Sequence, residues 1–490
     1  MDSKSDSHKV SKGAIAYFGR QVVVTMFGFG ANVVLLKLLL PEDFGVFSVI
    51  TLVMSLLGVL ADGGMNVYLI QNQQVENEGK MLNLFLSNQL FVYSIIHLTY
   101  SVAIAVLLLL GHCPVLLIYL WGAALSTIPS LFRGAGFVIL ERQLNMVKVA
   151  LVETTEAIAY SVSSVVLALA GAGVWSIIIA LSIKGLIGCL LAIKYSGFNY
   201  QPVRPKWNAN VARAVGFGLH YHAATIMGVV RGIAGPMIIG PLLGLAAVGL
   251  LDRSGYIAYI PLMLIGTVQS RVLFPYYAKM QGDMARTGRV LRKCIYVSGV
   301  LDKLIYIPIF LLSPCLPRIM GEKWSPAVGL IQIISIGHMA FGALSTSLSP
   351  MIAGMGKARW MSMLSWVPVA IMYILIWPMA TWLGLQGAAW VNVIIWLASL
   401  AAVFFVKQEW PEFELWSAWL IPVTAVAITL GATVLTFPNY GILLLPKLLG
   451  VTAIAMGVFI LILKILNPAL FASETSDLKA RIWNIDKRHK

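Results

Sequence analysis

Long apolar segments recur along the whole chain, and this feature most constrains what it can fold into. Each segment is about 20 residues or more in length, which is what an α-helix needs to cross the roughly 30 Å hydrocarbon core of a bilayer. Charged residues make up only 11% of the chain, against about 25% in a typical soluble protein. The sequence therefore predicts an all-α polytopic membrane protein. A β-barrel is disfavoured, because barrel strands are alternating segments of about ten residues.

The apolar pattern predicts about fourteen transmembrane helices, several of them joined by very short turns. Each of these turns contains Pro or Gly, the residues that break helices and accept tight turns; they lie at 41–43, 171–173, 240–241 and 384–387. The predicted spans are 14–40, 43–70, 81–110, 114–139, 149–170, 173–194, 211–239, 243–270, 294–314, 325–353, 360–382, 385–406, 415–437 and 448–466.

The basic residues predict the orientation of these spans. With the N-terminus in the cytoplasm, nearly all Lys and Arg residues outside the spans fall on the cytoplasmic side. Only Arg318, Lys323 and Lys447 fall on the opposite side. This bias sets topology in multi-pass proteins, so we expect both termini to be cytoplasmic. Contacts with anionic membrane lipids account for the net charge of +15 without a nucleic-acid partner.

The chain also carries signs of an internal duplication. When the sequence is shifted by 204 positions, the turn at 39–45 aligns with residues 243–249, and the helices that follow have the same length. Two six-helix halves that start on the same side of the membrane form a parallel repeat, and transporters of this kind open a cavity between their lobes. The predicted parts are an N-lobe (1–197), a cytoplasmic linker (198–210), a C-lobe (211–408), two further helices (409–470) and a cytoplasmic tail (471–490).

Charged residues inside the predicted spans are the main candidates for function, because burying a charge in a membrane is costly and such residues usually face a bundle interior or a wet cavity. The candidates for a cationic cleft are Arg20, Lys37, His220, Arg231, Arg253 and Arg271. The candidates for a coupling or polar stripe are Asp62, Asn66 and Asp252. Asp62 follows Ser48 and Ser55 at intervals of seven residues, which places all three on one face of a helix.

Several of these charges also have a purely structural interpretation. Lys37, Arg20 and Arg133 lie near enough to helix ends to extend toward headgroups, and His220 is more often a packed histidine than a proton relay. Lys184, Glu153 and Glu156 are interpreted as structural or interfacial. For the adjacent pair Asp302 and Lys303, pairing with a neighbouring helix and a functional role remain equally open. No catalytic motif or metal-ligand spacing occurs among these residues or the four cysteines, so we expect no enzyme activity, no metal and no cofactor.

Four stretches of the chain resemble the Wzx-type oligosaccharide flippases. They are LLKLLLPEDFGVFSVI (35–50), LADGGMNVYLIQ (60–71), GLLDRSGYIAYIPLMLIGTVQSRVLFPYYAKMQ (249–281) and MGEKWSPAVGLIQIISI (320–336). The resemblance covers about residues 14–408 and is greatest to the colanic-acid exporter branch of the multidrug/oligosaccharidyl-lipid/polysaccharide exporter superfamily. It implies two six-helix lobes in a V, as in multidrug (MATE) transporters. The family's basic position before the turn falls on Lys37, and the aspartate of its D-x-G motif falls on Asp62.

The resemblance also implies an activity, namely movement of undecaprenyl-pyrophosphate-linked oligosaccharide repeat units from the cytoplasmic to the periplasmic leaflet by alternating access. The diphosphate would bind the basic cleft, because charge-assisted contacts to phosphate are strong. Polysaccharide polymerase and glycosyltransferases are the expected protein partners. The alternatives are a lipid II flippase, a MATE-like cation-coupled drug antiporter, and a membrane glycosyltransferase or polymerase.

Overall fold

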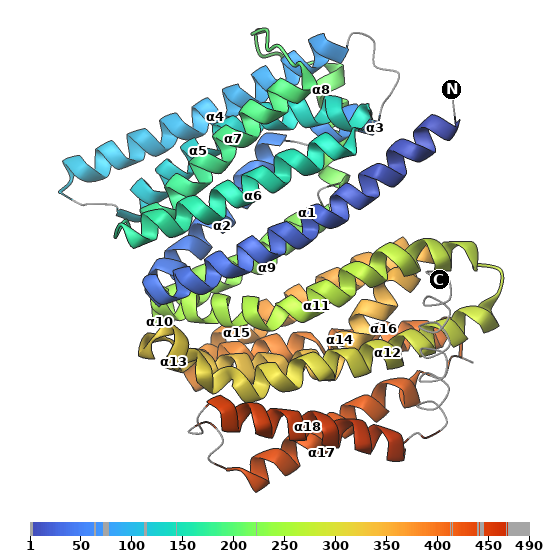
Figure 1. Cartoon of the computed structure of the whole chain (residues 1–490). Coiled ribbons are helices and arrows are strands. Elements are labelled where there is room, and N and C mark those ends of the chain that lie inside the picture. The colour runs from blue at the N-terminus through green and yellow to red at the C-terminus, as the bar shows by residue number, and fades with distance from the viewer. Residues whose placement is uncertain are drawn as a thin grey trace, which may run out of the picture. The chain divides into compact units, whose positions relative to one another are not determined.

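The part of the chain that the structure describes is all-helical (Figure 1). The computed structural model describes residues 3–62, 65–71, 78–111, 115–143, 145–221, 223–411, 413, 415–438, 441, 445–466 and 468. Thirteen of the described helices are long and apolar enough to cross a membrane. The all-α polytopic prediction is therefore confirmed.

One of these thirteen segments contains two crossings. Met363–Gln408 has 46 residues and would be about 70 Å long as a straight helix, more than twice the thickness of the hydrocarbon core. Gly384 interrupts it with φ 59° and ψ −140°, in the turn predicted at 384–387. Within that turn a Cβ on Gly387 would fall 1.9 Å from the carbonyl oxygen of Met379. The hairpin therefore needs a glycine at both positions, and counting its two arms separately gives the predicted fourteen crossings.

The chain divides into two compact units, Met1–Gly249 (unit 1) and Leu250–Lys490 (unit 2). Helix α11 (Leu245–Lys279) begins in unit 1 and continues in unit 2. The other elements of unit 1 are α1 (Ser3–Leu38), α2 (Pro41–Asp62), α3 (Met65–Gln71), α4 (Glu78–Leu109), α5 (Val115–Arg142), α6 (Met146–Leu169), α7 (Trp175–Ser196), α8 (Ala209–Tyr221), α9 (Ala223–Ala234), the π-helix η1 (Gly235–Ile239) and α10 (Gly240–Leu243). The domain boundaries expected from the sequence remain a prediction.

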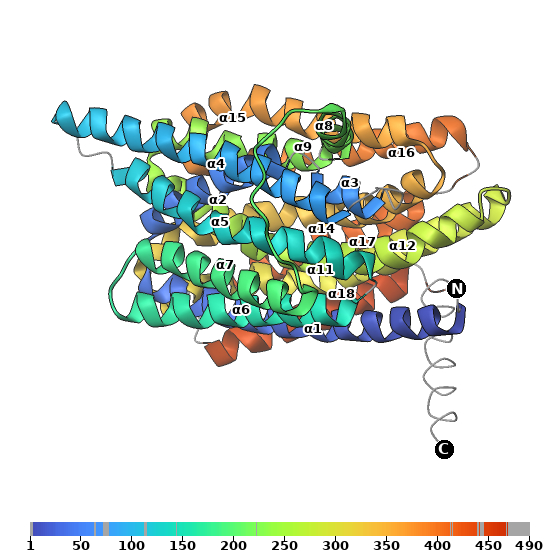
Figure 2. The same cartoon turned by 90° about the horizontal axis from the view of Figure 1, so that it is seen from above.

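Unit 1 is built around the closely packed helices α5, α6 and α7, with α1 lying along α6 (Figures 1 and 2). Small residues make this packing possible. A Cβ on Gly136 of α5 would lie 3.0 Å from the backbone of Ala192 on α7. One on Gly185 of α7 would lie 2.9 Å from the carbonyl oxygen of Ser126 on α5. Since neither helix presents a large side chain there, the polar residues beside these contacts are brought close together.

The segment predicted as a linker is held against α4 by side-chain hydrogen bonds. The backbone N–H groups of Gln201, Val203 and Lys206 donate to Asn83 Oδ1, Ser87 Oγ and Asn88 Oδ1, at 3.1, 3.2 and 3.0 Å. Asn83 and Ser87 are buried. The extended segment therefore obtains the backbone hydrogen bonds that a helix would have supplied internally.

The starts of α2 and α11 cross at two glycines of unit 1. A Cβ on Gly45 would lie 1.9 Å from the carbonyl oxygen of Leu245, and one on Gly249 would lie 1.8 Å from the carbonyl oxygen of Pro41. A shift of 204 positions turns each contact into the other, which is the pattern expected from duplicated halves. Only glycine allows two backbones to approach this closely.

One sequence-based detail is wrong. The turn predicted at Gly240–Pro241 lies instead at Gly244 (φ +87°), because η1 and α10 continue the helix past Gly240. Of the single helix predicted over 43–70, the structure describes α2 up to Asp62 and α3 from Met65, and residues 63–64 lie outside the described residues. The polar stripe through Asp62 to Asn66 remains a prediction.

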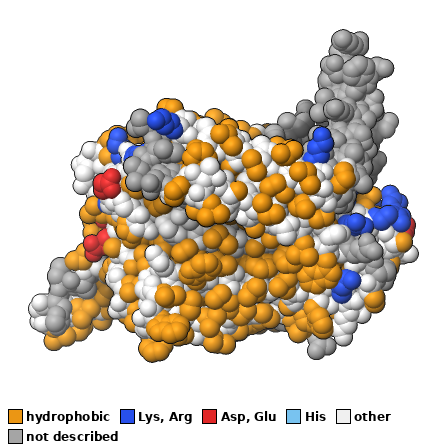
Figure 3. All heavy atoms as spheres, turned by 90° about the horizontal axis from the view of Figure 1, so that it is seen from below, with side chains coloured by type: hydrophobic (Ala, Val, Ile, Leu, Met, Phe, Trp, Pro, Cys, Tyr) orange, Lys and Arg blue, Asp and Glu red, His pale blue; other side chains and the backbone are white. Residues whose placement is uncertain are grey.

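The remaining elements of unit 2 surround α12 and α14. They are α12 (Met284–Leu312), the 3-10 helix η2 (Ser313–Cys315), α13 (Leu316–Met320), the 3-10 helix η3 (Glu322–Trp324), α14 (Ser325–Gly354), α15 (Ala358–Ile395), α16 (Ala398–Glu409), α17 (Trp416–Thr436) and α18 (Leu445–Leu466). Helices α17 and α18 pack on α12 through Tyr306, Ala425 and Phe459. Figure 3 shows a face on which hydrophobic side chains cover the middle while Lys and Arg side chains lie near its ends, as expected for a surface in contact with lipid.

Candidate functional site

Five ionisable side chains of unit 1 gather between α1, α5, α6 and α7. They are Arg20, Arg133, Glu153, Glu156 and Lys184, and we call them the charge cluster. Arg20 of α1 lies 3.0 Å from Glu153 of α6, measured from Nε to Oε2. With the side chains 24% and 18% exposed, this ion pair is largely withdrawn from the surface of unit 1.

Arg133 of α5 occupies the centre of the charge cluster. Its Nε donates to Glu156 Oε1, its Nη2 lies 3.8 Å from Glu153 Oε1, and its guanidinium stacks on the Phe137 ring at 4.1 Å. The Glu156 side chain is only 3% exposed. The two glutamates are one helical turn apart and share a face of α6, so both can reach the same guanidinium.

Helix α7 completes the charge cluster with a lysine and a glycine. The Lys184 ammonium lies 6.0 Å from the centre of the Tyr160 ring and interacts electrostatically with both glutamates. A Cβ on Gly188 would fall on Glu156 Oε1. Glycine is therefore required at 188 if the carboxylate is to lie between α5 and α7.

A cavity of about 190 Å³ opens beside Arg133, Glu156 and Lys184. Hydroxyl groups of α5 line it as well: Ser126, Thr127 and Ser130. The Ser126 and Thr127 hydroxyls donate to carbonyl oxygens of their own helix, which leaves their oxygen atoms able to accept hydrogen bonds. The cavity therefore offers cationic donors together with neutral and anionic acceptors.

The size of this cavity limits what it can hold. Pockets for drug-sized ligands are roughly 300–1,000 Å³, so the cavity accommodates one small group and not a whole oligosaccharide. Glu141 of α5 also interacts electrostatically with Glu153 and Arg133, so the three basic side chains of the charge cluster are balanced by three carboxylates. The guanidinium of Arg133 and the ammonium of Lys184 line the cavity and can donate hydrogen bonds to a phosphate or to sugar hydroxyls.

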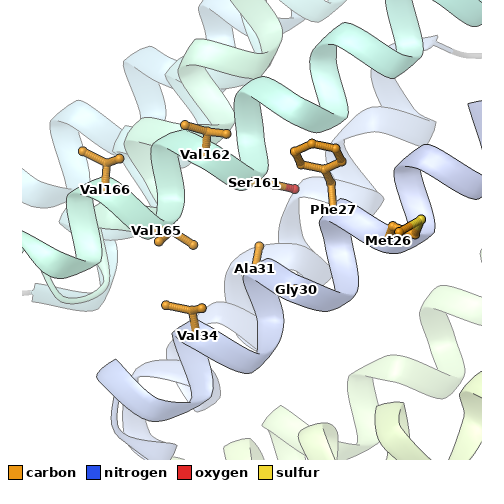
Figure 4. A pocket seen from close by; sticks show the side chains of 9 residues that line it. All are labelled: Met26, Phe27, Gly30, Ala31, Val34, Ser161, Val162, Val165 and Val166. Atoms are coloured by element: carbon orange, nitrogen blue, oxygen red, sulfur yellow. The ribbon is translucent and has the colours of Figure 1, made fainter.

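An apolar groove lies between α1 and α6, beyond the charge cluster. It has a volume of about 420 Å³, and Figure 4 shows Phe27, Ala31 and Val34 of α1 facing Ser161 and Val165 of α6. Ser161 is the single polar side chain among those that line it. In a membrane this surface suits hydrocarbon chains.

The predicted residue Arg253 is held by its neighbour in the sequence. Its Nη2 and Nε lie 2.5 and 2.9 Å from Asp252 Oδ2, and its guanidinium lies 5.4 Å from the centre of the Tyr256 ring. Arg253 is buried, with 9% exposure. The two residues proposed for separate roles, Arg253 in the cleft and Asp252 in the stripe, thus form one ion pair on α11.

The other predicted residues are only partly described. Lys37 is exposed in the last turn of α1, Arg231 lies half-buried on α9, and Asn66 of α3 lies against Gly134 of α5. The side chains of Asp62, His220 and Arg271 lie outside the described residues. Among the predicted candidates, Arg20 is the one that the structure places in the charge cluster, and the roles assigned to the others remain predictions.

The charge cluster itself was not recognised as a site from the sequence. The spacing of Glu153 and Glu156 was a usable signal, because two acids three residues apart in an apolar helix present one polar face. Their partners come from α1, α5 and α7, and the apolar pattern does not reveal which helices are neighbours. Arg133 is ion-paired inside unit 1, which argues against its alternative interpretation as a residue that extends toward headgroups.

Sequence comparison places this chain among proteins of surface polysaccharide synthesis. The family model described as "Polysaccharide biosynthesis protein" matches residues 34–329. The succinoglycan biosynthesis transport protein ExoT of Rhizobium meliloti (strain 1021) is 24% identical over 388 residues, covering 78% of this chain and 75% of that protein. The lipopolysaccharide biosynthesis protein WzxC of Escherichia coli (strain K12) is 23% identical over 325 residues, or 64% of each chain.

Solved structures share the fold at low sequence identity. The lipid II flippase MurJ in an inward closed conformation has a TM-score of 0.66 at 16% identity, with coverage of 94% of this chain and 99% of that one. An inward-facing multidrug resistance MATE transporter has a TM-score of 0.59 at 13% identity, covering 81% and 98%. These values establish a shared architecture and say nothing about the molecule that is moved.

Proposed function

The chain belongs to the polysaccharide biosynthesis protein family as a transporter of the Wzx flippase type, and we propose that it moves undecaprenyl-pyrophosphate-linked oligosaccharide units across the bacterial inner membrane. Transport runs from the cytoplasmic to the periplasmic leaflet, with both termini in the cytoplasm. The observation that carries this proposal is the family match over residues 34–329. The charge cluster supports it, since the Arg133 guanidinium and the Lys184 ammonium line a cavity inside an apolar bundle and can contact an anionic headgroup.

The charge cluster can receive a diphosphate by exchange of ion-pair partners. Arg133 is already bound by two carboxylates, so its charge is stabilised before the substrate arrives. A phosphate that enters the neighbouring cavity finds the Arg133 guanidinium and the Lys184 ammonium together, and contacts of this charge-assisted kind are roughly twice as strong as neutral hydrogen bonds. The sugars remain in hydrated space and the prenyl chain in lipid.

The remaining predicted cations extend this proposal beyond the charge cluster. We expect Arg231, Arg253, Lys37, Arg271 and His220 to contact the anionic headgroup during transport, and Arg231→Ala or Arg253→Ala to abolish transport while expression is retained. Glycosyltransferases supply the repeat unit and the polymerase consumes it. A lipid II flippase remains the alternative in the same superfamily. A drug antiporter for cations is disfavoured, because a cationic drug would be repelled by an excess of basic side chains.

Complementation tests the substrate class directly. The chain is expressed in cells that lack their own polysaccharide flippase, and surface polysaccharide is measured alongside a second strain depleted of its lipid II flippase. Restored polysaccharide without restored growth of the second strain supports the proposal, and the reverse pattern contradicts it. Lys464→Gln, an exposed lysine in the last turn of α18, is the control for Lys184→Gln: the first should retain export and the second should reduce it.

A further inference from the structure

A buried polar stripe runs along α12 inside unit 2. Ser298, Asp302 and Tyr306 are spaced by four residues and therefore share one face of the helix; they are 3%, 0% and 0% exposed. Ser298 pairs with Gln269 of α11, and the Tyr306 hydroxyl donates to the Ala258 carbonyl of the same helix at 2.7 Å. The stripe therefore faces α11.

Asp302 lies at the middle of this stripe and has no partner of its own there. Neither of its carboxylate oxygens has a hydrogen-bond partner among the described residues. The side chain points toward α14, since a Cβ on Gly342 would lie 3.3 Å from Oδ2. Lys303 interacts with it electrostatically but donates no hydrogen bond to it, and an ionised carboxylate buried without hydrogen bonds is strongly disfavoured. In this structure, the surroundings of Asp302 therefore suit its neutral, protonated form. The ionised form requires a conformation in which these surroundings are rearranged.

The adjacent Lys303 is buried just as completely but on another face. It is 0% exposed, and its Nζ has no partner in the described part of the chain. Gly299, one turn earlier on the same face, lies against Pro422 of α17 and Ala343 of α14, so both helices cover the face that carries Lys303. The two side chains do not form an ion pair of 4 Å or less within the described structure.

We propose that Asp302 is the proton-binding residue of this transporter, taking up a proton in one conformation and releasing it in another. This inference rests on the proposed transport function. A proton fits this position better than a metal ion does, because a metal needs several oxygen ligands and a space of its own, whereas a proton needs only the carboxylate. Ser298 and Tyr306, one turn away on either side, give the proton polar neighbours inside an otherwise apolar core.

The other ionisable groups around Asp302 are few. On α12 itself they are Lys303 and Tyr306; α14 contributes His338, whose ring stacks on Tyr306 at 5.6 Å, and α11 contributes Tyr259 beside that histidine. Helix α17 has no ionisable residue, and α18 has only Lys447 and Lys464 near its ends. Within unit 2, Asp302 is therefore the acid that these helices enclose.

Infrared difference spectroscopy tests proton binding without any substrate. Spectra of the purified full-length protein are recorded in acidic and alkaline buffer for the wild type and for Asp302→Asn. We expect a carbonyl-stretch band of a buried carboxylic acid in the wild type, its loss in Asp302→Asn and a displaced band in Asp302→Glu. Asp283→Asn is the control, because Asp283 caps the exposed end of the same helix and Asn is an equally good cap. A wild-type band in Asp302→Asn overturns the proposal.

Transport in proteoliposomes gives a second readout, in which the comparison of the two gradients uses the wild type alone. A polyprenyl-diphosphate oligosaccharide is the probe, and a proton gradient or a sodium gradient is applied to the wild type. We expect the proton gradient to drive accumulation and Asp302→Asn to allow only equilibration. Accumulation driven by sodium alone, at constant pH, contradicts the proposal. If the wild type moves no probe under either gradient while the infrared band is present, the proposed substrate fails and the proton site stands.

Discussion

The ion pair between Arg133 and Glu156 allows a quantitative test of the charge cluster. Removing one partner of a buried ion pair typically costs about 3–5 kcal/mol, because the other charge stays buried and unpaired. Here the Arg133 side chain is 27% exposed and retains Glu153 at 3.8 Å, so we expect Glu156→Leu to cost about 2–3 kcal/mol. Replacing both residues with apolar ones of similar size is often close to neutral, so Arg133→Met with Glu156→Leu should be milder than Glu156→Leu alone.

A double-mutant cycle measures this coupling. The free energy of unfolding in detergent micelles is determined by denaturant titration for the wild type, the two single variants and the double variant. We expect a coupling energy of roughly 2 kcal/mol, within the range seen for residues in one ion-pair network. Additive effects of the two substitutions would refute the assignment of a buried, mutually dependent pair.

The same double variant separates stability from transport. Its core is apolar but intact, so it should fold; it lacks the guanidinium, so it should not export polysaccharide. Export at the wild-type level by the folded double variant would show that the pair serves packing alone.

The remaining predictions concern backbone packing and the linker. Gly249→Val should lower the free energy of unfolding by about 1–3 kcal/mol or more, because its Cβ would fall on a carbonyl of α2. Gly450→Val is the control, because a Cβ at Gly450 meets open space. Equal thermal unfolding temperatures for the two variants would contradict the helix crossing at Gly249. Ser87→Ala should speed proteolysis of the segment at 197–208, since it removes the hydrogen bonds that Ser87 makes with the Val203 N–H and the Tyr200 hydroxyl, each with a net contribution of about 0.5–1.5 kcal/mol, whereas Ser55→Ala should not. Gly384→Ala should lower the free energy of unfolding by about 1–2 kcal/mol in a thermal melt, because φ is positive at this residue. An unchanged free energy of unfolding would contradict the turn at Gly384.

The helical crossings and the turn at Gly384 could be predicted because they depend on local physics. A run of apolar residues of sufficient length has few alternatives to a transmembrane helix, and Gly384 breaks its helix by its own backbone conformation. Gly240 and Pro241 suggested a turn, but the π-helix before them lets the chain continue to Gly244.

The charge cluster and the stripe on α12 depend on which helices become neighbours. Helical periodicity assigned Glu153 and Glu156 to one face, yet nothing local indicates that α5 would place Arg133 against that face. The surroundings of Asp302 could likewise not be predicted. Its spacing with Ser298 and Tyr306 defines one face of α12 but does not identify the helix that covers this face. Residue spacing is therefore enough to define polar faces on single helices. Which of these faces come into contact depends on helix packing at small residues such as Gly188.

Flipping by the purified protein tests the central claim most directly. Proteoliposomes are loaded with a fluorescent polyprenyl-diphosphate oligosaccharide, and its appearance in the outer leaflet is followed with a membrane-impermeant quencher. Loss of one charge-assisted contact of about 1.5–3 kcal/mol corresponds to a rate lower by about 10- to 150-fold, which is the result expected for Arg133→Gln if it retains the wild-type elution profile. Wild-type flipping by folded protein that carries both Arg133→Gln and Lys184→Gln would contradict the account.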